Sequence, residues 1–120
     1  MTKKNPFKTA TCYRAKPYPY NVYMTTTVEE AQGMQKYMKA GVDNFNGTGG
    51  VCICYSDDEC GMTLIVGWFN GKPWTLAHEC YHACMKIMAA CGVNTTADNN
   101  EHFAYMLSDM IEYFWSKRKC

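Results

Sequence analysis

Two histidines and a glutamate, in the order His78-Glu79-Cys80-Tyr81-His82, carry the most specific chemical signal in the chain. On an α-helix, residues four apart lie about 40° from each other around the axis, so both imidazoles can reach one metal ion from the same side. Glu79 then lies at the edge of that face, where its carboxylate can contact a metal-bound water without displacing it. Two neutral nitrogen ligands and a carboxylate base are the groups that zinc-assisted peptide hydrolysis requires.

The residues around this motif predict an amphipathic helix that turns both histidines away from the core. At about 100° per residue, the apolar side chains form one stripe opposite His78 and His82. The members of that stripe are Leu76, Cys80, Ala83, Cys84, Ile87 and Cys91. Pro73 suits the first turn of the helix, and Gly92 suits its end. The alternatives to a metal site are a histidine satisfied in the core and two unconnected histidines on a solvated helix face.

A catalytic zinc ion takes three protein ligands, and four later side chains are candidates for the third: Asp98, Glu101, His102 and Glu112. Glu101 is the preferred candidate, because Ala104 and Ser108 on the same helix face are small and would let this helix approach the motif helix closely. In the alternative, Asp98 is the N-cap and Glu101 completes a capping box, which assigns Glu101 to the helix start. His102 points about 100° away from Glu101, and it is either a rival ligand or a donor to a developing oxyanion.

Length, charge and hydropathy restrict the class of protein. With 120 residues and a formal net charge of +1, the chain predicts a single domain without the charged surface that binds nucleic acid or an anionic membrane. No apolar run approaches the roughly 20 residues of a membrane span. The basic first residues are not followed by the apolar segment of a signal peptide. We therefore expect a cytoplasmic protein.

The eight cysteines are expected to be mostly buried thiols that pack as small apolar groups. The cysteines of the motif helix fit this interpretation, because they lie on its core side. One alternative is a structural zinc site built on Cys52, Cys54 and Cys60, although their spacing is not the usual paired C-x₂-C pattern. A disulfide-linked secreted module is the other alternative.

The whole chain predicts one small α+β domain, in which a short antiparallel sheet packs on the motif helix and on a last helix. Pro17 and Pro19 argue against a central strand in the N-terminal arm, residues 1–19. Thr27 and Glu30 form a capping box that opens the first helix. The expected elements, in the order β-α-β-β-α-α, are a strand near Tyr20–Met24, a helix from Val28 that Gly41 ends, a hairpin of Val51–Tyr55 and Met62–Phe69, the motif helix, and a helix from about residue 98 to about residue 117.

An H-E-x-x-H helix followed about 20 residues later by Glu101, at the start of the next helix, resembles the gluzincin arrangement of zinc peptidases. The small size and the hairpin before the motif helix resemble the minigluzincins, the HExxH proteins encoded by bacteriophages and, more distantly, the metallopeptidases that cleave phage-type repressors. The likeness covers residues 62–115. It implies a zincin-like domain that binds Zn²⁺ through His78, His82 and Glu101, with Glu79 as general base.

The resemblance also implies where a protein or peptide substrate would lie. An extended peptide would bind beside Met62–Phe69, in a host cytoplasm if a phage encodes the chain. The oxyanion donor stays open among Tyr81, His102 and Tyr105. The expected function is that of a zinc metallopeptidase. The alternative is a catalytically silent binding protein on the same fold, which acts by occupying a host protein.

Overall fold

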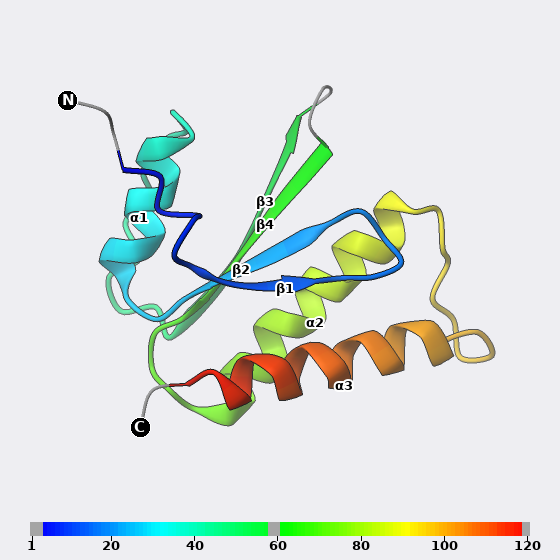
Figure 1. Ribbon diagram of the computed structural model, residues 1–120. Coiled ribbons are helices and arrows are strands. Elements are labelled where there is room, and N and C mark those ends of the chain that lie inside the picture. The colour runs from blue at the N-terminus through cyan, green and yellow to red at the C-terminus, as the bar shows by residue number, and fades with distance from the viewer. Residues whose placement is uncertain (1–3, 58–60, 119–120) are drawn as a thin grey trace.

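The computed structural model describes residues 4–57 and 61–118 (Figure 1). The α+β class predicted from the sequence is confirmed, with one strand more than expected. The elements, in chain order, are β1 (Thr11–Arg14), β2 (Asn21–Thr25), α1 (Val28–Tyr37), β3 (Gly50–Asp57), β4 (Gly61–Trp68), α2 (Pro73–Ala90) and α3 (Glu101–Ser116).

The four strands form one mixed sheet in the order β1-β2-β4-β3. β1 and β2 pair antiparallel, and so do β3 and β4, which confirms the predicted hairpin. β2 and β4 run parallel, with Val22 opposite Leu64. The prediction of an antiparallel sheet is therefore wrong at this central pair. A parallel pair needs a long connection between its two strands. Here α1, the segment after it and β3 all lie between β2 and β4 in the chain.

The extra strand, β1, lies within the predicted N-terminal arm. It is an edge strand, which agrees with the argument that the nearby prolines exclude a central position. Tyr13 of β1 is buried, and its hydroxyl donates a hydrogen bond of 2.7 Å to the carboxylate of Asp109 in α3. This hydrogen bond attaches the N-terminal arm to α3, although the two residues are 96 positions apart in the sequence.

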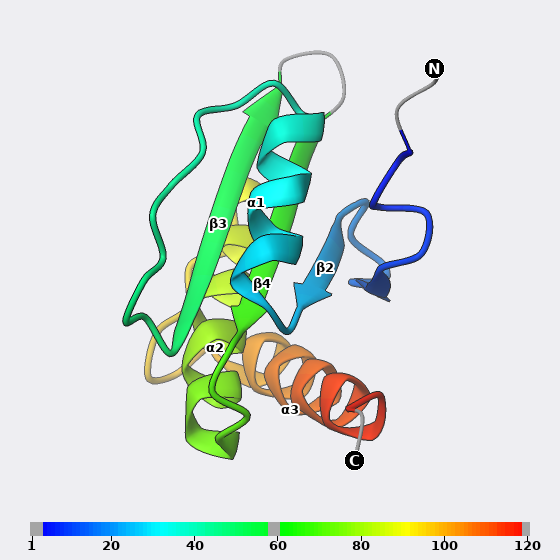
Figure 2. The same cartoon turned by 90° about the vertical axis from the view of Figure 1, so that its left-hand side faces the viewer.

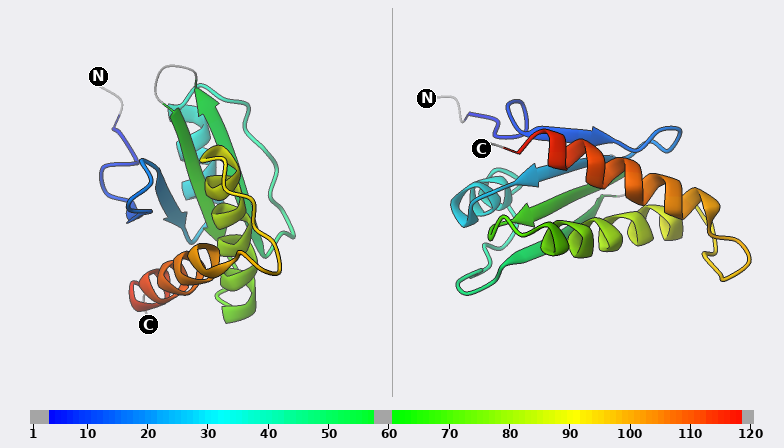
Figure 3. Two further views of the ribbon diagram at one scale, coloured as in Figure 1. Left: turned by 90° about the vertical axis from the view of Figure 1, so that its right-hand side faces the viewer. Right: turned by 90° about the horizontal axis from the view of Figure 1, so that it is seen from below.

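Helices cover both faces of the sheet. α1 lies on one face, and α2 and α3 lie together on the other (Figures 2 and 3). The core between the sheet and the two later helices is built from β2, β4, α2 and α3. Its fully buried side chains include Val22, Leu64, Val66, Leu76, Cys80, Ala83, Cys84, Ile87, Met110 and Phe114. The apolar stripe predicted for the motif helix is confirmed as its buried side from Leu76 to Ile87, whereas Cys91 follows the helix end and is only partly buried.

Local signals in the sequence set two helix starts. Thr27 caps α1, and Glu30 accepts the backbone N–H of Thr27 in return, so the predicted capping box is confirmed. Pro73 occupies the first turn of α2, where a missing N–H costs no intrahelical bond. Gly92 follows α2 with a φ of 73°, a left-handed conformation that suits glycine and ends the helix.

Candidate metal centre

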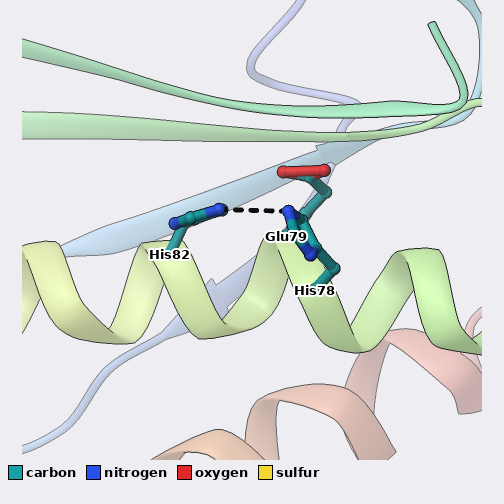
Figure 4. Close-up of side chains that lie close together, drawn as sticks. All are labelled: His78, Glu79 and His82. Carbon is teal, nitrogen blue, oxygen red and sulfur yellow. Dashed lines mark hydrogen bonds between the residues drawn. The ribbon is translucent and has the colours of Figure 1, made fainter.

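The two motif histidines face each other on an exposed side of α2 that is turned away from α3 (Figure 4). Their Nε2 atoms lie 3.2 Å apart, and their rings are nearly perpendicular, at 78°. Two nitrogen ligands of a tetrahedral zinc ion, each about 2.0–2.1 Å from the metal, would lie about 3.4 Å apart. The spacing of His78 and His82 therefore suits two ligands of one ion. It also suits a single N–H···N hydrogen bond when no ion is bound.

Glu79 lies beside the histidines but is buried, with 7% of its surface exposed. One oxygen of its carboxylate and one nitrogen of each imidazole all lie within 4.8 Å of one another. Burial raises the pKa of the Glu79 carboxyl above its ordinary value, and the neighbouring imidazoles lower it in part. The cluster of His78, Glu79 and His82 is thus able to hold a metal ion, with a carboxylate of raised basicity at its inner side.

Gly50, the first residue of β3, allows α2 to approach the sheet at this site. A Cβ atom at residue 50 would lie 2.5 Å from Cγ2 of Thr75 and 3.1 Å from Cγ of Glu79. Carbon atoms do not approach this closely in well-packed interiors, so a side chain at residue 50 would push α2 outward. Because residue 50 is glycine, the side chains of Thr75 and Glu79 can lie close to the start of β3.

β3, and not β4, is the edge strand beside the candidate metal centre. In the part of the chain that the structure describes, the outer edge of β3 pairs with no other strand. β4 lies between β2 and β3, so its main-chain groups already pair on both sides. The expectation that Met62–Phe69 receives an extended peptide is therefore wrong. The strand that comes last before α2 in the sequence is not the outermost strand in space.

The structure does not bring Glu101 to the two histidines. Among the described residues, the group of side chains that could hold one ion contains only His78, Glu79 and His82. Figure 4 shows these three side chains rising from one side of α2, while α3 passes on its other side. Glu101 is exposed at the start of α3. Its assignment as a third ligand within the same chain is therefore not supported by this geometry.

The predicted contact face of α3 is also wrong. α3 buries its larger apolar side chains, Met106, Met110 and Phe114, and leaves the stripe of Glu101, Ala104, Tyr105 and Ser108 exposed. Large apolar groups gain more from burial than small ones do, so the apolar stripe decided which face packs inward. The small residues of the other stripe remain available at the surface.

The alternative role of Glu101 as a capping-box residue is wrong as well. The N-cap of α3 is Asn100 and not Asp98, and it makes no side-chain cap bond. The amide of Asn100 donates instead to the carbonyl oxygens of Thr96 and Ala97. Glu101 is therefore the first helical residue, and capping does not occupy its carboxylate.

The three candidate oxyanion donors lie in different surroundings. The ring of Tyr81 lies 5.9 Å from that of His82 and 5.3 Å from that of Phe103, measured between centroids. Tyr105 is 71% exposed, on the outer side of α3. His102 is exposed in the first turn of the same helix. Of the three, Tyr81 is the one that the structure places beside the metal centre.

Cysteines cluster on the inner side of α2. The described cysteines carry free thiols. Cys80 and Cys84 are buried, as expected, but the other four, Cys12, Cys52, Cys54 and Cys91, are only partly buried, so the expectation of mostly buried thiols is met in part. Burial raises the pKa of Cys84 to about 12, and it does the same for Cys52 on β3. Cys60 of the alternative structural zinc site lies outside the described residues. Thiols this resistant to ionisation behave as packing groups.

Comparisons with protein-family models, with curated proteins and with solved structures find no match to this chain. Within the described residues, no helix is long and apolar enough to cross a membrane. The chemistry of the site must therefore be argued from its own residues and their positions.

Proposed function

We propose that this protein is a zinc-dependent metallopeptidase in which His78 and His82 hold the ion and Glu79 is the general base. The observation that carries the proposal is the 3.2 Å spacing of the two Nε2 atoms beside a buried carboxylate. Imidazole nitrogens with a carboxylate nearby suit zinc better than the hard cations Mg²⁺ and Ca²⁺. A zinc ion bound here would polarise a peptide carbonyl and lower the pKa of a coordinated water.

Glu79 has the position and the environment of a base. Its carboxylate lies between α2 and β3, where burial favours the protonated form. A proton taken from water in the centre could be held there and passed to the amine that leaves when the peptide bond breaks. One carboxylate would thus serve both proton transfers, first as base and then as acid.

The outer edge of β3, with which no other strand pairs among the described residues, would be the binding site for an extended substrate. Its N–H and C=O groups can pair with a peptide main chain, which would add a strand to the sheet. The close approach of Gly50 to Thr75 and Glu79 of α2 supports this proposal, because it brings the start of β3 next to the Glu79 side chain. This proposal transfers the peptide-binding role from β4, where the resemblance implied it, to β3.

Replacing Glu79 by Gln tests the proposal most directly. We expect the variant to retain zinc, measured by metal analysis, and to cleave an unfolded protein mixture roughly 100- to 10,000-fold more slowly. His82→Ala should lose both zinc and turnover. Glu29→Gln is the matched control, because that exposed glutamate lies on α1, on the opposite face of the sheet. Peptide cleavage by Glu79→Gln at the parent rate would contradict the proposal.

A catalytically silent, zinc-dependent binding protein is the second candidate. The position of Glu101 favours it, because two histidines without a third ligand are fewer than catalytic zinc sites take from protein. A protein of this kind would hold a stoichiometric partner with the same affinity in the wild type and in Glu79→Gln. It would show no turnover with zinc bound.

A further inference from the structure

Helices α2 and α3 form one layer on the sheet (Figure 3), and two adjoining hollows lie on that layer. The first has a volume of about 530 Å³ and follows α3; its apolar lining comes from Phe103, Ala104, Leu107 and Ile111. The second has a volume of about 390 Å³ and lies at the end of α2; its apolar lining comes from Met85, Met88, Ala89 and Val93. Because Thr95 and Thr96 line both hollows, the two form one continuous groove, the α2–α3 groove.

Large apolar side chains are exposed at this groove. Met85, which lines it, is 37% exposed. Tyr81 is 46% exposed, and its ring centroid lies 5.3 Å from that of Phe103 in the groove wall. Exposed apolar area costs free energy in water, so a concave surface of this kind is stabilised when another apolar group covers it. Methionine suits such a surface, because its unbranched and polarisable side chain adapts to the shape of a partner.

Exposed carboxylates border the groove and decide the chemistry of its occupant. On a helix, residues three and four apart are neighbours. Glu101 is therefore next to Ala104 of the groove wall, and Glu112 is next to Ser108, which also lines the groove. Asp98 is exposed in the segment that joins the two helices. The margin of the α2–α3 groove is thus acidic.

The helical layer has few cations to offset this margin. Residues 73–116 contain five acidic residues, one lysine and no arginine. That lysine, Lys86, lies two turns after Glu79 on the side of α2 that approaches β3, away from the groove. A second copy of the chain is a poor occupant, because two such grooves facing each other would oppose like charges. An anionic membrane would be repelled for the same reason.

We propose that the α2–α3 groove binds an amphipathic helix of a partner protein, whose apolar side enters the groove and whose flanking residues are lysine or arginine. Between Phe103 and Ile111 the wall on α3 is about 12 Å long, at 1.5 Å per residue, which matches about two turns of a bound helix. Apolar side chains at i, i+3 or i+4, and i+7 of the partner would then lie along it. His78 and His82 do not line the groove, so binding here is independent of the proposed zinc site.

Synthetic peptides test this binding mode. The probe is a fluorescein-labelled peptide of about 14 residues, built from leucine and lysine so that the leucines lie on one side of a helix. We expect it to bind the wild type saturably, measured by fluorescence anisotropy. One control peptide has the same composition in an order that spreads the leucines around the helix, and another has glutamate in place of lysine. Each control should bind at least about 10-fold more weakly, because the first lacks an apolar side and the second is repelled.

Substitutions in the groove locate the binding site. Ala104→Lys places a long cationic side chain in the groove at an exposed position, so it should keep the circular dichroism of the wild type and bind the probe at least about 10-fold more weakly. Glu112→Lys should weaken binding several-fold, and more at low ionic strength. Glu29→Lys is the matched control and should bind as the wild type does, because this exposed glutamate lies on α1, on the opposite face of the sheet.

Three results would overturn the inference. The first is a failure of the probe to bind, or equal binding by either control peptide. The second is an unchanged affinity of Ala104→Lys, which would place the probe elsewhere on the surface. The third is a wild type that self-associates in light scattering and becomes monomeric in Ala104→Lys, which would assign the groove to a second copy of the chain.

Discussion

Helices α2 and α3 pack side by side on the sheet, yet they differ on both their inner and outer sides. The inner side of α2 includes the thiols Cys80 and Cys84, whereas that of α3 carries Met106, Met110 and Phe114. The outer side of α2 carries the histidine pair, and that of α3 carries carboxylates. The comparison separates two tasks: the inner sides contribute most to stability, and the exposed side of α2 carries the two histidines of the candidate metal centre.

Removing the largest inner side chain of α3 should have the largest effect on stability. Phe114 is fully buried, and its ring centroid lies 5.6 Å from that of Tyr113 and 6.2 Å from that of Tyr13. We expect Phe114→Ala to lower the free energy of unfolding by about 3–5 kcal/mol, since it leaves a cavity. Denaturation with urea measures this loss. Cys84→Ala, at a buried position of α2, is the control and should cost less, because it removes a smaller group. A loss below about 1 kcal/mol for Phe114→Ala would contradict the separation of tasks.

Alkaline pH should weaken the inner side of α2 but not that of α3. The pKa of Cys52 and of Cys84 is about 12 in the folded protein, raised chiefly by burial, from an ordinary value of 9.0. A raised pKa means that each thiol contributes its full stability below about pH 9 and loses it as the pH rises toward 12. At about pH 10 the loss should be roughly 1 kcal/mol for each thiol. Urea titrations at several pH values measure it.

The same experiment with Cys84→Ala distinguishes this thiol from other titrating groups. The variant should lose less stability between about pH 8 and about pH 10 than the wild type does, because one buried thiol no longer ionises. An unchanged alkaline slope would show that Cys84 is not the source. The inner side of α3 includes no ionisable group among its buried residues, so Met110→Leu should leave the slope as it is in the wild type.

The smallest predicted effect concerns the contact that ties β1 to α3. Tyr13→Phe removes the hydroxyl that donates to Asp109 and should cost about 1 kcal/mol, the usual net value of such a bond. Tyr113→Phe is the matched control, since the structure gives its hydroxyl no hydrogen bond among the described residues. Equal stability of Tyr13→Phe and wild type would show that packing alone holds β1 on α3.

Local features of the fold could be predicted from the sequence. The motif helix follows from one apolar stripe, Pro73 and Gly92, and the start of α1 follows from Thr27 and Glu30. Each of these signals acts within a few residues, so no knowledge of distant contacts is needed. The pairing of β2 with β4 could not be obtained in this way. It depends on where the chain returns after α1, and no local pattern records that.

The candidate site, too, could be predicted only where its residues lie close together in the sequence. His78, Glu79 and His82 lie within one helical turn and a half, so their spacing in sequence determines their spacing in space. Glu101 belongs to another helix, whose rotation about its own axis decides where the carboxylate points. Two stripes of α3 competed for the inward position, one of small residues and one of large apolar residues. Burial of the larger stripe turned Glu101 outward.

Gly50 brings the start of β3 close to the helix that carries the candidate metal centre. The 2.5 Å that would separate a Cβ atom there from Thr75 leaves room for a hydrogen atom and nothing larger. The distance between the start of β3 and this part of α2 therefore depends on the absence of a side chain at residue 50. A methyl group at residue 50 would act as a wedge between helix and sheet, so any redesign of the spacing between them has to begin at that glycine.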